Sequence, residues 1–540
     1  MTTPNWKRRV AASTAAAGLL LLAACGGGDE ASQDVTTGAV TAQQALADNV
    51  APHANRDDAE DAAQYDAASA ISITLADGAS TTSDDAAVAI DGDTVTIGAA
   101  GTYVLTGSLD DGQVVVASEG DGEVKLVLDG VGITSEADSP LVVTQADETT
   151  VVLAEGSQNT LADGADSAAD DEEEDAANAT LWSSDDLTIA GDGALTVTSQ
   201  AADGITVKDG LVVLGGEISV EAGDDGIRGK DYLALDGGRI SITAGGDGLK
   251  SDDDTDAGTG YVLLDGAAVT ADVGDDGVSA TTDVLVASGS LDVTATAPST
   301  EEDPSPKGLN AGAVVAISGG DVVVDESEEA VQGTVVSITD GTVDLTATDD
   351  GINASSGSGE SMAAEDGVEL VISGGSVTVD AEGDGLDSNG TTTITGGTVV
   401  VDGPTRDGNG ALDAAGGTTV DGGSLLAVGS GGMAEAPTES SKQGWLQASL
   451  GTAAAGATVT VLDADGNEVA THTLAKAAAN LLVAGDDIET GASYTVQVDG
   501  EEVASVTAGE STGGGMQGGR GGGGPEGGPG GDMAPPERQR

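Results

Sequence analysis

The sequence predicts an all-β chain: a parallel β-helix, which is a solenoid of short stacked strands, with a small antiparallel β cap at its C-terminus. Composition is the first indication, because the 540 residues include 85 Gly and no Phe, with only five Tyr and three Trp. Such a chain cannot build a bulky aromatic core, and its many Val, Ile, Leu and Ala residues suit a repetitive β fold. An internal repeat with a period near 22 residues is the second indication.

The repeat consists of two alternating apolar segments on either side of a Gly-Gly or Asp-Gly turn, as in LVVLGGEISV (211–220) and LVISGGSVTV (370–379). A second marker, Asp-Gly followed by Ile, Leu or Val, recurs along the same stretch. Each repeat can bury its apolar face only against the next one, so this period predicts a solenoid, with a long antiparallel sandwich as the alternative. The turn glycines are Gly216, Gly238, Gly266, Gly289, Gly320, Gly341, Gly375, Gly397 and Gly423.

Changes in composition predict the domain organisation. Alternating segments around the Asp465-Gly466 turn indicate antiparallel strands that cover the last turn of the solenoid, whose open end would otherwise template aggregation. The predicted parts are a lipoprotein signal peptide (1–24), a disordered tether (25–68), N-terminal β rungs with an acidic loop (69–180), the parallel β-helix (181–432), the antiparallel cap (433–510) and a disordered Gly-rich tail (511–540).

The first 25 residues resemble a bacterial lipoprotein signal. Basic residues at 7–9 precede an apolar run at 10–24 that is too short to span a bilayer, and the run ends in Leu-Ala-Ala-Cys. We therefore expect Cys25 to carry lipid and to anchor the protein on the extracellular side of the cell membrane; an ordinary secretory signal is the alternative. Because Cys25 is the only cysteine, no internal disulfide can form.

The strongly acidic composition of the chain suits the binding of cations. A net charge of −77 repels nucleic acid and anionic membrane faces, so we expect neither as a partner apart from the lipid anchor. In a solenoid, equivalent residues lie about 4.8 Å apart, and a column of carboxylates at that spacing is stable when Ca²⁺ lies between them. The alternative is that Asp-Gly only forms turns. We predict Ca²⁺ as cofactor, with candidate ligands Asp224, Asp225, Asp247, Asp252, Asp253, Asp275, Asp276, Asp384 and Asp387.

Basic and aromatic residues are scarce, and some of them gather on three consecutive repeats. The clustered basic residues either bind an anionic sugar or pair with neighbouring aspartates. Two tyrosines, Tyr232 and Tyr261, occupy matching positions on adjacent repeats. A sugar ring stacks on an aromatic face through its C–H groups. The candidate glycan-binding residues are Lys208, Arg228, Lys230, Lys250, Tyr232 and Tyr261.

No pattern identifies an enzyme. His53 and His472 lie far apart, no zinc-ligand spacing or phosphate loop occurs, and no pair of carboxylates stands out for glycoside hydrolysis. We therefore expect no catalytic residues.

Several segments in order resemble one known family: GTYVLTGSLDDGQVVV (101–116), KLVLDGVGIT (125–134), LWSSDDLTIAGDGALTV (181–197), DGIRGKD (225–231) and DGLKSDD (247–253). The chain looks like a member of the bacterial carbohydrate-binding, pectate-lyase-like β-helix family. That resemblance implies a right-handed parallel β-helix with bound Ca²⁺ and binding of plant-type polysaccharide, cellulose or acidic pectin. The shortage of exposed aromatic residues weakens the cellulose part.

Three function classes follow. The first is a monomeric, non-catalytic cell-surface lipoprotein that binds polysaccharide, with an acidic, pectin-like glycan favoured. The alternatives are a structural or adhesive spacer stiffened by calcium, and a calcium-dependent polysaccharide lyase. A glycan array with and without chelator separates the first two, and the ultraviolet absorbance of unsaturated products identifies a lyase.

Overall fold

The structure, a computed structural model, describes residues 38–52, 59–136, 138–164, 177–297, 305–357 and 363–511. These residues belong to one compact unit, Gln33–Arg540. The predicted signal peptide, Cys25, most of the predicted acidic loop and the Gly-rich tail from residue 512 lie outside the described residues.

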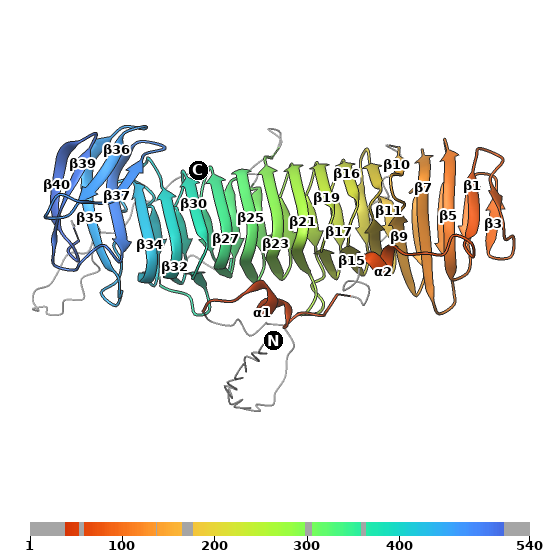
Figure 1. Ribbon diagram of the computed structural model, residues 1–540, viewed down its shortest axis with the longest axis horizontal. Coiled ribbons are helices and arrows are strands. Elements are labelled where there is room, and N and C mark those ends of the chain that lie inside the picture. Colours follow the sequence, from red (N-terminus) through yellow and green to blue (C-terminus); the bar gives the residue numbers. More distant parts are fainter. Residues whose placement is uncertain are drawn as a thin grey trace, which may run out of the picture. The chain divides into compact units, whose positions relative to one another are not determined.

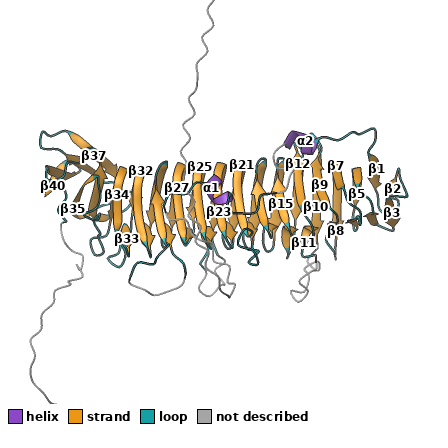
Figure 2. Ribbon diagram, turned by 90° about the horizontal axis from the view of Figure 1, so that it is seen from below, coloured by secondary structure: helices purple, strands orange, loops and turns teal. Residues whose placement is uncertain are grey.

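The described chain is almost entirely β, and its strands form three sheets (Figures 1 and 2). The largest sheet has 22 strands: β1 (Ile71–Leu75), β2 (Thr81–Thr82), β5 (Gly101–Leu109), β7 (Glu123–Ser135), β9 (Glu148–Leu153), β10 (Gln158–Asp163), β12 (Leu187–Gly191), β13 (Ala194–Thr198), β15 (Gly210–Val213), β16 (Glu217–Ala222), β18 (Tyr232–Leu235), β19 (Arg239–Ala244), β21 (Tyr261–Val273), β23 (Asp283–Ala295), β25 (Val314–Glu326), β27 (Val335–Ala347), β29 (Glu369–Ile372), β30 (Ser376–Ala381), β32 (Thr391–Asp402), β34 (Thr418–Gly429), β35 (Gly444–Ala453) and β38 (Ala478–Gly485).

The second sheet has 14 strands: β3 (Val88–Asp91), β4 (Thr94–Ile97), β6 (Gln113–Ala117), β8 (Leu141–Gln145), β11 (Ala179–Ser183), β14 (Asp203–Val207), β17 (Ile227–Gly229), β20 (Leu249–Ser251), β22 (Val278–Ala280), β24 (Lys307–Ala311), β26 (Glu329–Gly333), β28 (Ile352–Ala354), β31 (Leu386–Ser388) and β33 (Leu412–Ala414). The third is antiparallel: β36 (Thr458–Leu462), β37 (Glu468–Thr473), β39 (Ser493–Val498) and β40 (Glu501–Thr507).

Most strands of the first two sheets pair in parallel with the equivalent strand of the next repeat. In the 14-stranded sheet Ile205 is opposite Ile227, and Ile227 is opposite Leu249. These apolar side chains alternate with outward polar ones, and the inward set joins one continuous core of Val, Ile, Leu and Ala. Each repeat therefore depends on its neighbours for burial, as the apolar pattern indicates.

The predicted fold, a right-handed parallel β-helix with a separate cap, is wrong in that simple form. The large sheet branches and includes antiparallel pairs, namely β1–β2, β34–β38 and β35–β38. Two strands of the predicted cap, β35 and β38, thereby belong to the large sheet, and only the four-stranded sheet is separate. The chain is thus all-β with several sheets.

The turn glycines explain part of this difference. Long strands such as β23 and β27 continue through them with a bend, so both segments of a repeat lie in one sheet. At Gly289 the φ angle is 99°, and a Cβ atom there would lie 2.3 Å from the Ala267 carbonyl oxygen of the preceding repeat. Only glycine tolerates that backbone at so short a distance, so the strand bends without a break.

The N-terminal part of the described chain is also ordered. Residues 38–52, called the N-terminal segment below, include helix α1 (Ala42–Leu46), and helix α2 (Ala59–Ala63) follows. Both helices lie against the large sheet, α1 near β23 and β25 and α2 near β9 and β12 (Figure 2). The predicted disordered tether is therefore wrong for these residues. No helix among the described residues is both long and apolar enough to cross a membrane.

Candidate cation and glycan site

The Asp of the Asp-Gly marker forms a ladder from one repeat to the next. The backbone N–H of Asp225 donates to Asp203 Oδ1 (3.2 Å), that of Asp247 to Asp225 Oδ1 (2.9 Å), and that of Asp276 to Asp247 Oδ1 (3.0 Å). Further along, Asp384 N–H donates to Asp350 Oδ1 at 2.6 Å. One oxygen of each carboxylate is thus used for stacking, and the other oxygen needs a separate partner.

For Asp225 and Asp247 that partner is a basic side chain. Lys250 Nζ lies 2.8 Å from both Asp225 Oδ2 and Asp247 Oδ2. Burial opposes the charge of Lys250, but Asp225 and Asp247 outweigh it and raise the pKa of this lysine. Arg228 forms an ion pair with Asp252, which lies outside the ladder, through Nε to Oδ1 at 3.0 Å. These residues form ion pairs, which is the structural alternative considered above.

Two groups of carboxylates further along the chain show no such ion pair among the described residues. The central acidic cluster consists of Glu329, Asp349 and Asp350, with one oxygen of each within 4.8 Å of the others. Burial, followed by Asp349 and Asp384, raises the pKa of Asp350 to about 8. Glu329 Oε2 and Asn353 Oδ1 are buried without a hydrogen-bond partner in the described structure. Buried, unpaired oxygens carry a free-energy penalty that a cation would remove.

The C-terminal acidic cluster consists of Asp384, Asp387 and Asp413, again with one oxygen of each within 4.8 Å of the others. Burial raises the pKa of Asp384 to about 6, and burial together with Asp384 raises that of Asp387 to about 7. The carboxylate of Glu435 is close enough that burial and Asp413 raise its pKa to about 7. Ionised carboxylates this close repel one another, so the cluster has an oxygen-rich environment suited to a divalent cation.

The predicted ligands are distributed unevenly over these features. Asp384 and Asp387 lie in the C-terminal cluster, while Asp247, Asp275 and Asp276 form a third group beside Lys250. Asp224 is exposed. Asp253 accepts hydrogen bonds from Thr255 Oγ1 (2.8 Å) and Thr259 Oγ1 (2.6 Å).

Sequence reasoning missed Glu329, Asp349, Asp350 and Asp413. The triplet Asp-Asp-Gly at 349–351 repeats those at 224–226 and 275–277, and that signal was available.

The two tyrosines are stacked, with ring centroids 5.5 Å apart and planes at 20°. Both are nevertheless buried, Tyr232 at 4% and Tyr261 at 0% exposure. Apolar residues of the N-terminal segment pack on them, and the Tyr261 hydroxyl donates to the Val50 carbonyl at 2.7 Å. The pair therefore presents no ring face to a glycan. Lys208 and Lys230 are half-buried, and Lys230 lies near Asp209, Asp231 and Asp253.

A row of polar side chains, called the polar row below, runs across the outward face of the 14-stranded sheet from β17 to β33; β24 and β26 each carry a second half-exposed polar residue beside it, Lys307 and Glu329. The side chains of the polar row are opposite one another in consecutive pairs and are all half-exposed. Basic residues stand at one end, amides in the middle and carboxylates at the other end. In order they are Arg228, Lys250, Ser279, Asn310, Gln332, Asn353, Asp387 and Asp413.

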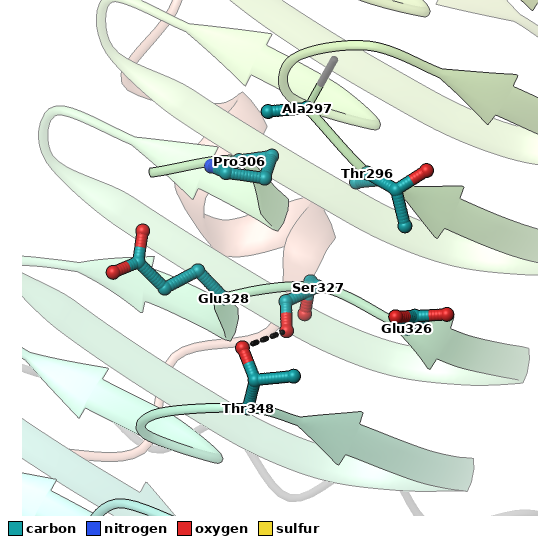
Figure 3. Close-up of a pocket in the computed structure, with 8 residues that line it drawn as sticks. Thr296, Ala297, Pro306, Glu326, Ser327, Glu328 and Thr348 are labelled. Atoms are coloured by element: carbon teal, nitrogen blue, oxygen red, sulfur yellow. Dashed lines mark hydrogen bonds between the residues drawn. The ribbon is translucent and has the colours of Figure 1, made fainter. Parts of the chain in front are cut away.

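A pocket of about 350 Å³ adjoins the central acidic cluster (Figure 3). Glu326, Ser327 and Glu328 line it from the end of β25 and the connection to β26. The remaining lining residues are Ala295, Thr296, Ala297, Pro306 and Thr348. The Thr348 hydroxyl donates to the Ser327 carbonyl at 3.2 Å. Its lining includes no basic side chain among the described residues, so the pocket adds to the acidic character of this region.

Comparison with known proteins shows which proteins part of this chain is similar to. Residues 91–351 match a family described as carbohydrate-binding domain-containing protein. The resemblance inferred from the sequence is confirmed at this coarser level, as similarity to a carbohydrate-binding domain family.

A protein of Acetivibrio thermocellus with that same description is 37% identical over 122 residues, which are 23% of this chain and 43% of the relative. The match thus spans less than half the length of that relative. A solved structure of a polysaccharide lyase-like protein from C. thermocellum, a gadolinium derivative, shares 26% identity with a TM-score of 0.41, covering 51% of this chain and all of that chain.

Proposed function

We propose that this protein is a non-catalytic polysaccharide-binding protein whose binding surface contains calcium. The family match over residues 91–351 supports the carbohydrate part. The observation that carries the calcium part is the central acidic cluster, where two buried oxygens have no hydrogen-bond partner among the described residues.

Calcium fits these oxygens better than other common ions. Ca²⁺ takes six to eight oxygen ligands in a flexible geometry, and both acidic clusters offer carboxylates only, supplemented by the Asn353 amide oxygen at the central one. When bound, the ion neutralises the clustered carboxylates and offers open positions to ligand oxygens. Glu329, Asp349 and Asp350 would hold one ion and Asp384, Asp387 and Asp413 another. Several of the predicted aspartates would then have structural roles in the ladder.

An acidic, pectin-like glycan is the favoured partner. A chain with a net charge of −77 repels a polyanion unless a cation bridges the two. A uronate carboxylate can complete the coordination of calcium, whereas a neutral glucan lacks that group. Stacking on exposed tyrosines is not available, because Tyr232 and Tyr261 are buried.

A lyase that uses Lys250 or Arg228 as its base is disfavoured by the state of these two residues. Removal of a proton beside a uronate carboxylate needs an unprotonated base close to the substrate. Lys250 is held between Asp225 and Asp247, which raise its pKa, and Arg228 is paired with Asp252. Neither is suited to accept a proton.

For the location we propose a lipid anchor at Cys25, with the folded part on the extracellular side of the membrane as a monomer. The motif at 22–25 supports this assignment.

Binding of immobilised polygalacturonate with millimolar Ca²⁺ and with chelator tests the function. We expect retention with calcium, loss of retention with chelator, and no ultraviolet-absorbing unsaturated product in either case. Steady formation of that product would establish the lyase instead. A melting temperature that rises with calcium, without retention of any glycan, would establish a calcium-stiffened spacer.

A further inference from the structure

The amide side chains in the middle of the polar row are Asn310, Gln332 and Asn353, called the amide column below. Asn310 is opposite Gln332, and Gln332 is opposite Asn353, on strands β24, β26 and β28. Adjacent strands are about 4.8 Å apart, so the column presents one amide at every step of that length. Inward neighbours on the same strands, such as Leu309 and Val331, are fully buried, which fixes the amides on the outer face.

The amides differ in how much of their hydrogen-bonding capacity is used. Asn310 Nδ2 donates to Asp276 Oδ2 at 2.6 Å, and Asn353 Nδ2 donates to Glu329 Oε1 at 3.3 Å. Asn353 Oδ1 is buried and has no hydrogen-bond partner among the described residues, whereas the half-exposed Gln332 side chain makes no hydrogen bond within the described part of the chain. The column therefore has anchored ends and free donor and acceptor capacity at its centre.

We propose that the amide column is the track along which a linear polysaccharide lies, across the strands, with about one sugar unit per strand. This inference rests on the proposed function and names the surface that performs it. Carboxamides both donate to and accept from sugar hydroxyls, which a row of carboxylates or aliphatic residues cannot do. The strand spacing is close to the length of one pyranose unit in an extended chain, so successive amides meet successive sugars.

The surroundings define the class of sugar. Glu329 of the central acidic cluster accepts from Asn353, so the column and the cluster adjoin. A uronic acid unit on the track thus places its hydroxyls on the amides and its carboxylate toward the cation of the cluster. No aromatic side chain belongs to the polar row, so binding proceeds by hydrogen bonds to a single soluble chain, and a flat crystalline surface is a poor ligand.

Gln332→Ala is the sharpest test, because this side chain supports no hydrogen bond in the described structure. Gln497→Ala is its matched control: the same chemical change at a half-exposed position on β39 of the four-stranded sheet. The probe is a defined oligogalacturonide in millimolar Ca²⁺, measured by calorimetry with the full mature chain. We expect Gln332→Ala to weaken binding about twofold to tenfold, the range for one lost hydrogen bond. The melting temperature and its dependence on calcium should not change, and Gln497→Ala should bind like the unmodified protein.

The outcomes separate this inference from the proposed function. Unmodified protein that binds the probe, together with an equally tight Gln332→Ala variant, overturns the track and leaves the function standing. Unmodified protein that binds no glycan in calcium overturns both. Weakening by Gln332→Ala in parallel with a lower melting temperature assigns Gln332 a structural role and also overturns the track.

Discussion

Among the described residues, Lys250 is the basic side chain that pairs with two successive aspartates of the ladder, and its removal should destabilise the fold measurably. Lys250→Met keeps the length and the apolar stem of the side chain and deletes the charge. Asp225 and Asp247, which are 6% and 5% exposed, would then be two buried carboxylates without a counter-charge. Breaking a buried ion pair by removing one partner typically costs about 3–5 kcal/mol. The Lys250 side chain is 27% exposed, so solvent screens the pair and we expect a loss below that range, about 2–3 kcal/mol at pH 7.5.

The stability lost on Lys250→Met should depend on pH, and the titration of the buried carboxylates determines whether the loss grows or shrinks as the pH rises. Burial already raises the pKa of Asp247 to about 7 despite Lys250, and without the lysine it rises further. An acid whose folded pKa lies above its unfolded value of 3.8 loses stability as the pH rises above that value. The unmodified protein and the Lys250→Met variant should therefore be of similar stability near pH 4, and the variant should become progressively less stable than the unmodified protein toward pH 7.5.

Urea unfolding in chelator at pH 4.5, 6 and 7.5 measures this difference. Arg239→Met is the matched control, since Arg239 is exposed on β19 and its removal should change the free energy of unfolding by less than about 0.5 kcal/mol. A loss that is independent of pH, or no larger than that of Arg239→Met, would refute the view that Lys250 neutralises the ladder.

Three further predictions concern other parts of the chain. Tyr261→Phe removes the hydroxyl that donates to the Val50 carbonyl, so we expect the protein to be about 1 kcal/mol less stable and amide exchange within residues 38–52 to be faster. The control Tyr103→Phe, which deletes a hydrogen bond to Ala99, should leave that exchange unchanged. Burial raises the pKa of Asp283 to about 6, so the native protein should lose stability as the pH rises from about 4 to 6, and Asp283→Asn should remove that part of the slope; equal slopes in urea titrations would contradict it. Cys25→Ala should abolish labelling by radioactive palmitate in cells, and unchanged labelling would exclude the lipid anchor.

The repeat, the all-β class and the column of carboxylates could be predicted from the sequence, because each depends on short-range spacing. Alternation of apolar and polar residues indicates a strand, and Asp-Gly at intervals of 22 places Asp203, Asp225 and Asp247 on equivalent corners. Where the repeats keep a constant length, counting residues is enough to identify equivalent positions. The arrangement of the sheets could not be predicted in this way, because whether a strand breaks or bends at a turn glycine such as Gly289 depends on the backbone of the neighbouring repeat.

Only the tertiary structure decided which charged side chains lie close together and which segment covers the two tyrosines. Loops of different length precede β24, β26 and β28, so the meeting of Glu329 with Asp349 and Asp350 is not visible in the spacing. The burial of Tyr261 depends on Val50, which lies 211 residues earlier in the chain. A contact between residues so distant in sequence is specified by the sum of many weak packing interactions across the sheet. A local pattern reports the preference of a segment for a conformation, whereas the identity of its neighbour is set when the whole chain buries its apolar surface.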